Sequence, residues 1–430
     1  MEEWTTGSVE GCKMDALLPA DRERLRRLVA RKREIADDPV NRERRTAWLR
    51  HDAGTGGRPM ILAEWGGIHD RQNPLDIERR LHCVGDWARG VEWGLCAEIA
   101  RFEELRDDHV VEPWLSVNWN VSRSDYGVQP VVHTTQNEGQ MASRNWEPPI
   151  RDLDRDFDRL HLRSFAVDRA STLAAQAHLT AAVGDLCPVQ IRGAFYWTLG
   201  MTIEAIDLIG LEGLMLSMYD NPAGLHRLMS LLRDDHLAFN AWLEREGLLS
   251  LNNANDYIGS GSEGYSRQLP QPDAQPGQPV RLRDQWALLE SQETVGVGPE
   301  LFEEFIFPYQ LDLAQRFGRI YYGCCEPVNS RWQVLQRLPN LARVSISAWA
   351  DEELMAAACG TQVVYSRKPN PAMISTAAFD EQAIRADLRR TLDVARGCRV
   401  ELIMKDVHTL HEEPQRLARW VALARAACGG

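Results

Sequence analysis

The chain has 430 residues and a formal net charge of −13, with 49 lysine and arginine residues against 62 aspartate and glutamate residues. Hydrophobic residues make up 44% of the chain, which is enough for a large buried core and excludes global disorder. The acidic balance argues against nucleic-acid binding and against adhesion to an anionic membrane, because both surfaces repel a negatively charged protein.

Helical patterns dominate the N-terminal segment, and we interpret residues 1–55 as a helical extension. Asn41 is a candidate cap for the second of its two expected helices. Over residues 56–430, short apolar runs alternate with helical patterns, which indicates one further domain. Two segments, at about 119–160 and 260–285, interrupt the alternation, and we interpret them as insertions.

Nine short apolar runs separated by helical patterns are candidate strands. They span residues 59–65, 110–118, 189–195, 248–252, 286–291, 319–322, 343–347, 362–366 and 399–404. Strands that alternate with helices pair in parallel through right-handed crossovers. No glycine-rich dinucleotide or phosphate loop follows the first run, so we predict an α/β fold of the (β/α)8 TIM-barrel type rather than a doubly wound sheet. A closed barrel needs eight strands, and we expect the run at 286–291 to be the surplus one.

The N-terminus and the cysteine pattern favour a cytoplasmic protein. The first residues, Met1-Glu2-Glu3-Trp4, lack the positive charge of a signal peptide. The apolar stretch at 205–218 is too short to span a bilayer and carries two acidic residues. The nine cysteines are odd in number and scattered, which argues against a disulfide framework.

Polar side chains follow nearly every candidate strand. Because the active sites of (β/α)8 barrels lie at the carboxyl ends of the strands, we expect these side chains to share one site. The proton-handling candidates are Glu64, Lys405 and Asp406, and the substrate-binding candidates are Asn118, Asn253, Asp256, Trp349, Arg367, Lys368 and Asn370. The alternative for each residue is an ordinary polar side chain at the start of a loop.

Arg367 and Lys368, followed by Pro-Asn-Pro, form a stiff and electropositive turn in an otherwise acidic protein. The planar fork of an arginine suits a carboxylate or a phosphate. We therefore predict that this turn holds a substrate carboxylate, and a solvated loop start is the alternative.

Two adjacent thiols and a carboxylate, Cys324, Cys325 and Glu326, directly follow the run at 319–322. Thiolate and carboxylate groups are both zinc ligands, and a thiolate favours Zn²⁺ over Mg²⁺. The residues therefore indicate a zinc site, and packing at a strand end is the alternative. No pair of cysteines in CxxC spacing and no HExxH motif accompanies them.

Two further segments resemble the uroporphyrinogen decarboxylase superfamily. They are residues 211–229, LEGLMLSMYDNPAGLHRLM, and residues 298–309, GPELFEEFIFPY. The superfamily contains uroporphyrinogen decarboxylases and zinc-dependent, corrinoid-linked methyltransferases. The resemblance covers roughly residues 55–425 and implies a (β/α)8 barrel with an N-terminal helical extension.

Departures from the family motifs favour the methyltransferase branch. Uroporphyrinogen decarboxylases carry Arg-Gln-Ala-Gly-Arg after the first strand, where this chain has Glu64-Trp-Gly-Gly-Ile68. The methyltransferases carry His-x-Cys where this chain has Tyr322-Gly-Cys324, so Tyr322 replaces the histidine. The resemblance implies a variant zinc set of Cys324, Cys325 and Glu326, completed by Glu293 or Asp406.

Strand alternation makes a more specific prediction about these residues. It places Ile320, Tyr322 and Cys324 on one side of the strand, which we expect to be the barrel mouth. There the Tyr322 hydroxyl would contact a ligand or a metal-bound water. Cys325 would point toward the helix layer, unless a turn at Gly323 breaks the alternation.

Three functions are consistent with these features. The first is a corrinoid-dependent methyltransferase-like enzyme that acts on a small molecule, with the corrinoid carried by a partner protein. The second is a metal-independent decarboxylase or lyase acting on a small carboxylate. The third is a non-catalytic corrinoid or small-molecule binding protein. The sequence leaves the substrate and the oligomeric state open, a homodimer included.

Overall fold

The computed structural model describes residues 16–68, 74–135, 143–195 and 198–429. Its first two helices are α1 (Pro19–Ala36) and α2 (Pro39–Ala53), as the sequence predicts. The cap of α2 is Asp38, whose carboxylate accepts a hydrogen bond from the Val40 amide, and not the predicted Asn41. Asn41 is buried, and its side-chain amide donates to the carbonyl oxygens of Ala36 and Val111.

A six-stranded parallel sheet forms the centre of the molecule, in the order β1-β14-β13-β12-β11-β10. Its strands are β1 (Met60–Ala63), β10 (Trp286–Leu289), β11 (Arg319–Tyr322), β12 (Leu341–Ile346), β13 (Val364–Arg367) and β14 (Val400–Met404). Nearly all of their residues are buried, which is typical of parallel sheets covered on both faces. The predicted α/β class is therefore confirmed.

A second parallel pair consists of β2 (Leu115–Asn118) and β7 (Val189–Arg192). One backbone hydrogen bond joins the segment before β2 to the six-stranded sheet, and another joins the segment after β7 to it. The Asp108 amide donates to the Ile61 carbonyl at 2.8 Å, and the Leu199 amide donates to the Leu288 carbonyl at 2.9 Å. No continuous ladder joins the two sheets within the described residues, and the closed eight-stranded barrel that the sequence predicts is not found among them.

The prediction of the surplus strand was wrong. Residues 286–289 form β10 at the edge of the large sheet, whereas residues 248–252 form no strand. The Asn252 side chain accepts a hydrogen bond from the Trp286 amide at 2.8 Å and donates to the Trp286 carbonyl at 3.1 Å. A side-chain amide therefore covers the edge of β10 where a neighbouring strand would supply a peptide group.

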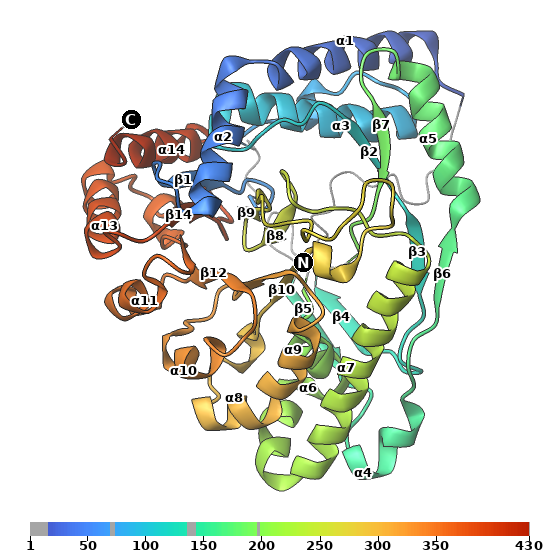
Figure 1. Cartoon of the computed structure of the whole chain (residues 1–430), viewed down its shortest axis with the longest axis vertical. Helices are drawn as coiled ribbons and strands as arrows, with labels where there is room; N and C mark the ends of the chain where they lie inside the picture. The colour runs from blue at the N-terminus through green and yellow to red at the C-terminus, as the bar shows by residue number, and fades with distance from the viewer. Residues whose placement is uncertain (1–15, 69–73, 136–142, 196–197, 430) are drawn as a thin grey trace.

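Helices surround the strands on most sides (Figure 1). They are α3 (Asp86–Ala100), α4 (Leu153–Asp156), α5 (Arg169–Val183), α6 (Thr202–Asp220), α7 (Pro222–Arg245), α8 (Pro299–Phe305), α9 (Phe307–Ala314), α10 (Trp332–Leu335), α11 (Glu352–Cys359), α12 (Ala372–Ser375), α13 (Glu381–Val394) and α14 (Gln415–Ala427). Asn221 caps α7 by accepting from the Gly224 amide, in the Asn-Pro pattern that the sequence contains. No helix among the described residues is both long enough and apolar enough to cross a membrane.

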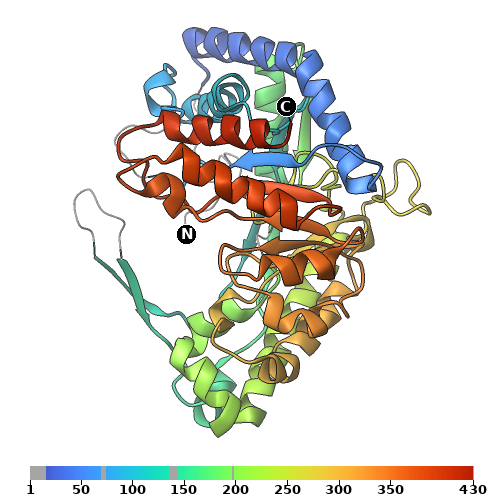
Figure 2. The ribbon, with the colours of Figure 1, turned by 90° about the vertical axis from the view of Figure 1, so that its left-hand side faces the viewer.

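The predicted insertion at 119–160 contains additional antiparallel structure. Its β3 (Asn120–Arg123) pairs with β6 (Phe165–Asp168), which lies just beyond the predicted end of the insertion. Its β4 (Val131–Thr135) and β5 (Ser143–Glu147) form a hairpin that extends away from the rest of the chain (Figure 2).

A short hairpin lies in the middle of the molecule, and its second strand falls within the other predicted insertion (Figure 1). It consists of β8 (Tyr257–Gly259) and β9 (Ser262–Glu263). A Cβ atom on Gly259 would lie 2.6 Å from the Tyr321 ring, and one on Gly261 would lie 2.7 Å from Ile403. Only glycine allows this approach, so the hairpin packs directly on the sheet. We call the face that it covers the inner face.

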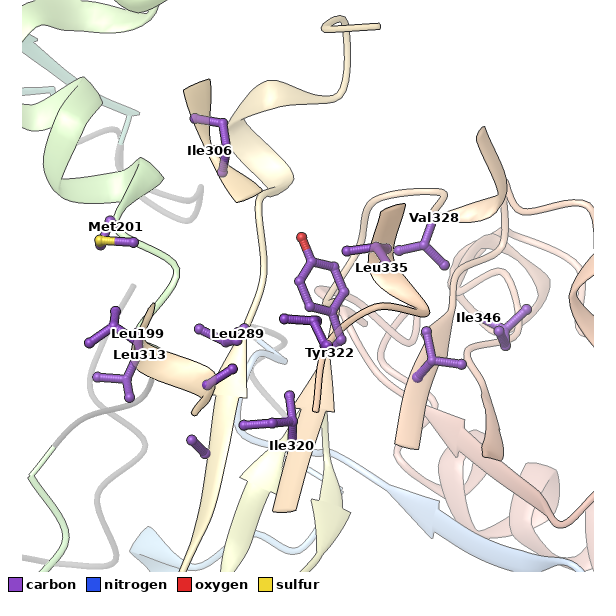
Figure 3. Close-up of a cluster of buried hydrophobic side chains, with 14 of the residues drawn as sticks. Leu199, Met201, Leu289, Ile306, Leu313, Ile320, Tyr322, Val328, Leu335 and Ile346 are labelled. Carbon is purple, nitrogen blue, oxygen red and sulfur yellow. The ribbon is translucent and has the colours of Figure 1, made fainter. Parts of the chain in front are cut away.

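The opposite, outer face of the sheet packs against the helices (Figure 3). Leu289, Ile320 and Tyr322 lie in one buried apolar cluster with Leu313 of α9 and Leu335 of α10. Tyr321, which lies between two of these residues in β11, belongs to a separate cluster on the inner face. Alternation along β11 therefore separates an apolar outer face from an inner face that carries polar groups.

Candidate active site

The turn after β11 decides which side chains meet on the inner face. Ile320 and Tyr322 point to the outer face, where Val328 and Leu335 lie beside the Tyr322 ring (Figure 3). Gly323 then adopts a φ of +94°, and Cys324 returns to the inner side with its Sγ atom 3.5 Å from the Lys405 Nζ atom. The prediction that Ile320, Tyr322 and Cys324 share one side was therefore wrong, because the glycine breaks the alternation.

The two adjacent thiols lie together. The Sγ atoms of Cys324 and Cys325 are 3.5 Å apart, and the Cys325 thiol donates to Asp406 Oδ2 at 3.1 Å. Their hydrogen bond and the ammonium group of Lys405 lower the pKa of Cys324, although burial opposes the shift. The same bond and burial raise the pKa of Cys325. Cys324 is thus the more acidic thiol of the pair, and the predicted orientation of Cys325 toward the helices was wrong.

Lys405 and Glu64 both lie beside the β8–β9 turn. The Lys405 Nζ atom donates to Ser260 Oγ at 3.4 Å, and a Cβ on Gly261 would lie 2.9 Å from Glu64 Oε1. Burial lowers the pKa of Lys405, but the charges of Glu64 and Cys324 place it well above its usual range. Burial raises the pKa of Glu64 against the attraction of Lys405. The site thus combines a thiol with a lowered pKa, an ammonium group and a carboxyl group with a raised pKa.

A second buried lysine lies on the inner face at the end of β13. The Nζ atom of Lys368 donates to Ser366 Oγ at 2.7 Å, to the Ser366 carbonyl at 2.9 Å and to the Tyr321 hydroxyl at 2.9 Å. Burial lowers the pKa of Lys368 to about 7, against the attraction of Glu401. Lys368 can therefore gain or lose a proton near neutral pH.

Glu326 and Glu293 do not join the thiols. The Glu326 carboxylate accepts the Ser291 amide at 3.0 Å and the Cys324 amide at 2.9 Å, and Glu293 accepts the Thr202 hydroxyl at 2.6 Å. Burial raises the pKa of Glu326. Among the described residues, no three or more His, Cys, Asp or Glu side chains are arranged to hold a metal ion. The predicted set of Cys324, Cys325, Glu326 and Glu293 therefore does not fit zinc in this structure.

Three predicted substrate-binding residues lie away from the thiols. Arg367 is 2% exposed and forms an ion pair with Glu352 of α11 at 3.1 Å, so it is not available to a substrate carboxylate. The Asn370 side chain accepts from the Ala372 amide at 2.9 Å at the start of α12. Trp349 is 70% exposed in the loop after β12.

Two of the remaining predicted residues, Asn118 and Asp256, lie at the carboxyl end of the β2–β7 pair. Arg192 of β7 forms an ion pair with Asp256 at 2.9 Å and lies opposite Asn118 in the ladder. Burial raises the pKa of Asp256 against the attraction of Arg192. Asn253 donates from its side chain to the Leu269 carbonyl at 2.7 Å, which places it in a structural role within its loop.

The sequence analysis missed the contribution of the central hairpin. Ser260 contacts Lys405, and Tyr257 lies close enough to Glu64, Lys405 and Cys324 to interact with their charges. Ser345 of β12 donates to the Cys324 carbonyl at 2.6 Å and fixes the turn. The run Gly259-Ser-Gly-Ser-Glu-Gly264 was the available signal, because several glycines in a short segment often mark a close approach of backbone to its surroundings.

Comparisons with known proteins leave the function to be argued from these residues. No family model matches the sequence, and no curated protein matches it. Among solved structures, a methyltransferase from Methanosarcina mazei is similar, with 12% sequence identity and a TM-score of 0.48. The similarity covers 90% of this chain and 99% of that one.

Proposed function

We propose that the chain is an enzyme that transfers a methyl group from or to a small molecule, with its reactive centre at Cys324, Lys405 and Glu64. One observation carries the proposal: the buried Cys324 sulfur, whose pKa is lowered, lies 3.5 Å from the buried Lys405 ammonium group at the carboxyl edge of a parallel sheet. The resemblance to corrinoid-linked methyltransferases supports the same position, because their cysteine ligand corresponds to Cys324. We propose that a partner protein carries the corrinoid.

The residues divide the work of such a transfer. A corrinoid supplies a cobalt centre that accepts or donates the methyl group. When a substrate loses its methyl group, the heteroatom left behind becomes basic, and the Glu64 carboxyl group donates its proton to that atom. When a thiol or an amine accepts the methyl group instead, the Glu64 carboxylate takes the proton that the acceptor loses. Lys405 stabilises negative charge that develops on the substrate in the transition state. The Cys324 thiolate holds the lysine in place and favours its charged form.

We assign zinc no role in these steps. Cys324, Cys325 and Asp406 are the donors nearest to one another, and the Lys405 ammonium group lies at the same thiolate that a zinc ion would need. Metal analysis of protein purified without a chelator measures directly whether the metal binds.

The test uses the full chain with methylcobalamin as the methyl donor and small thiols and amines as acceptors. We expect the wild type to accelerate demethylation of the cobalamin, followed by its absorbance. Glu64→Gln and Lys405→Met should each lower the rate by about 10²–10⁴-fold. Glu293→Gln is the matched control, because Glu293 binds Thr202 instead of the thiols. No transfer to any acceptor, together with no cobalamin binding, would contradict the proposal.

A decarboxylase or lyase is the second candidate, and Lys368 is the observation that favours it. Lys405, together with Lys368 at pH values below its pKa of about 7, provides two cations for a substrate carboxylate, since Arg367 is paired with Glu352. Loss of CO₂ leaves an electron pair on carbon, to which Glu64 donates its proton. Release of CO₂ from small carboxylates without a cobalamin requirement would establish this function instead, and tight cobalamin binding without turnover would indicate a binding protein.

We also propose that the two parallel sheets belong to one (β/α)8 arrangement. The parallel direction of both sheets and the single hydrogen bonds from Asp108 to Ile61 and from Leu199 to Leu288 support it. An experimental structure would test it through the strand neighbours of β2 and β7.

A further inference from the structure

We propose that Cys324 and Cys325 form a two-sulfur chelating site for trivalent arsenic or antimony. The inference rests on the thiol pair itself and does not require the proposed methyl transfer. The two Sγ atoms are 3.5 Å apart although the residues are adjacent in the chain. Adjacent side chains on an extended strand point to opposite faces, so this proximity requires the chain to leave the extended conformation, as it does in the bend at residues 324–326 after Gly323.

The two sulfurs are close enough for one thiophilic centre to bond both. With metal–sulfur bonds of about 2.3 Å, a linear ion holds its two sulfurs about 4.6 Å apart and a tetrahedral ion about 3.8 Å apart. A pyramidal trivalent centre with bond angles of about 95° and the same bond length holds them about 3.4 Å apart. The observed 3.5 Å is nearest to the pyramidal value.

The surroundings of the two thiols favour the replacement of hydroxide ligands on trivalent arsenic or antimony by sulfur. Cys324 has thiolate character beside Lys405, and a thiolate is the form of cysteine that bonds to soft centres. Cys325 is only partly buried, and it borders the exposed side chain of Asp406. An incoming ligand can therefore reach one sulfur from solvent and then the second sulfur beside it.

The reaction balances without an oxidant. An arsonous acid, R–As(OH)₂, loses two As–O bonds and gains two As–S bonds, and arsenic stays trivalent. The Cys325 proton leaves with one hydroxide as water, and the other hydroxide takes a proton from solvent.

Two thiols held together should bind much more tightly than either alone. Once the first As–S bond has formed, the second thiol acts at a high effective concentration, which raises affinity by about 10²–10⁴-fold. The Glu326 carboxylate adds to this advantage, because it accepts the Cys324 amide and so holds the turn before the ligand arrives.

The experiment titrates the full chain with phenylarsine oxide and follows intact mass, peptide mass and the number of thiols open to alkylation. We expect one adduct per chain that removes both Cys324 and Cys325 from alkylation. Cys324→Ser and Cys325→Ser should each weaken binding by about 10²–10⁴-fold. Cys398→Ser is the matched control, since Cys398 is also partly buried and its thiol donates to the Ala356 carbonyl at 3.4 Å.

Three results would overturn the proposal. They are an adduct that maps to other cysteines, affinities of both single variants within threefold of the wild type, and protection of the pair by Zn²⁺ at lower concentrations than the arsenical needs. A thermal melt of each variant establishes that it is folded, and Cys325→Ala provides a second substitution should the serine variant unfold. Since the readout is mass and thiol count, an absence of methyl transfer leaves the result unaffected.

Discussion

The pKa of Cys324 is lowered by its hydrogen bond with Cys325 and, next, by the charge of Lys405. Lys405 lies 3.5 Å from its Sγ atom and lowers the pKa of the thiol. Replacement of Lys405 by methionine should raise that pKa and reduce the thiolate fraction at pH 7. Each unit of pKa increase should slow alkylation of Cys324 by roughly tenfold. The rate is measured against pH by peptide mass spectrometry, with exposed Arg396→Gln as the control, and an unchanged pH profile would contradict the role of Lys405.

Lys368 gives the stability of the protein a pH dependence with a definite sign. Burial lowers its pKa to about 7 from the usual 10.5. Between these values the unfolded chain holds the proton that the folded chain has released, so the free energy of unfolding rises with pH. Lys368→Met removes this contribution, and its free energy of unfolding should rise less than that of the wild type from pH 7 to 9. Urea titrations at several pH values measure the difference, and parallel curves for the two proteins would contradict the shift.

At the residue scale, the sequence was sufficient where position along a strand decides the outcome. Glu64, Lys405 and Asp406 immediately follow buried strands, and the structure brings Lys405 and Asp406 to the two thiols and Glu64 close to both of them. The sequence was insufficient where one backbone angle or one ion-pair partner decides where a side chain points. The positive φ of Gly323 places the two thiols on the opposite face of the sheet from Tyr322. An ion pair with Glu352 directs the Arg367 side chain toward the helices. Neither effect follows from strand periodicity.

The packing of the central hairpin against the sheet can be tested by adding one methyl group at a glycine. Gly261 and Gly277 both have a φ of +82°, so alanine is strained at either position. A Cβ at Gly261 would also lie 2.7 Å from Ile403, whereas Gly277 has nothing within 4 Å. Gly261→Ala should therefore cost about 1–3 kcal/mol more than Gly277→Ala in free energy of unfolding. Urea denaturation measures both variants, and equal losses would show that the hairpin does not press on the sheet.

Glu326 connects the ends of β10 and β11. Its carboxylate accepts the amides of Ser291 and Cys324, and it is 1% exposed. Glu326→Ala leaves both amides without an acceptor, at a cost of about 1–3 kcal/mol for each. Glu326→Gln keeps one carbonyl oxygen and should lose less. Urea denaturation gives the cost, and Glu293→Ala is the control because its carboxylate accepts one hydroxyl. A loss no larger than that of the control would contradict this role.

At the scale of elements, alternation of strands and helices was enough to predict the α/β class but not the membership of the sheet. The runs at 248–252 and 286–291 are both short and apolar. Asn252 decides between them, since its side-chain amide pairs with Trp286 of β10. A contact between residues this far apart in the chain cannot be inferred from local periodicity. The prediction of the run at 286–291 as the surplus strand was wrong for this reason.

The whole molecule is connected through a charged layer at the amino end of the large sheet. Asp52, at the end of α2, forms ion pairs with Arg319 of β11 at 2.9 Å and Arg343 of β12 at 3.2 Å. Arg343 in turn pairs with Glu401 of β14 at 2.8 Å. All four side chains are buried. The helical extension therefore supplies a charge that the sheet needs, although the predicted domain boundary lies only three residues beyond Asp52.

Asp52→Ala should consequently destabilise the entire chain and not merely release the extension. It leaves two buried arginines with less compensating charge, and loss of one partner of a buried ion pair costs about 3–5 kcal/mol. Asp37→Ala is the matched control, because Asp37 forms an exposed pair with Arg33 at 3.6 Å, and this variant should lose less than about 1 kcal/mol in free energy of unfolding.

Urea unfolding is followed by tryptophan fluorescence for the whole chain and by alkylation of Cys324 for the far end of the sheet. Both probes should shift to lower urea together. A shift confined to one probe, or a loss equal to that of the control, would show that the extension and the sheet unfold as separate units.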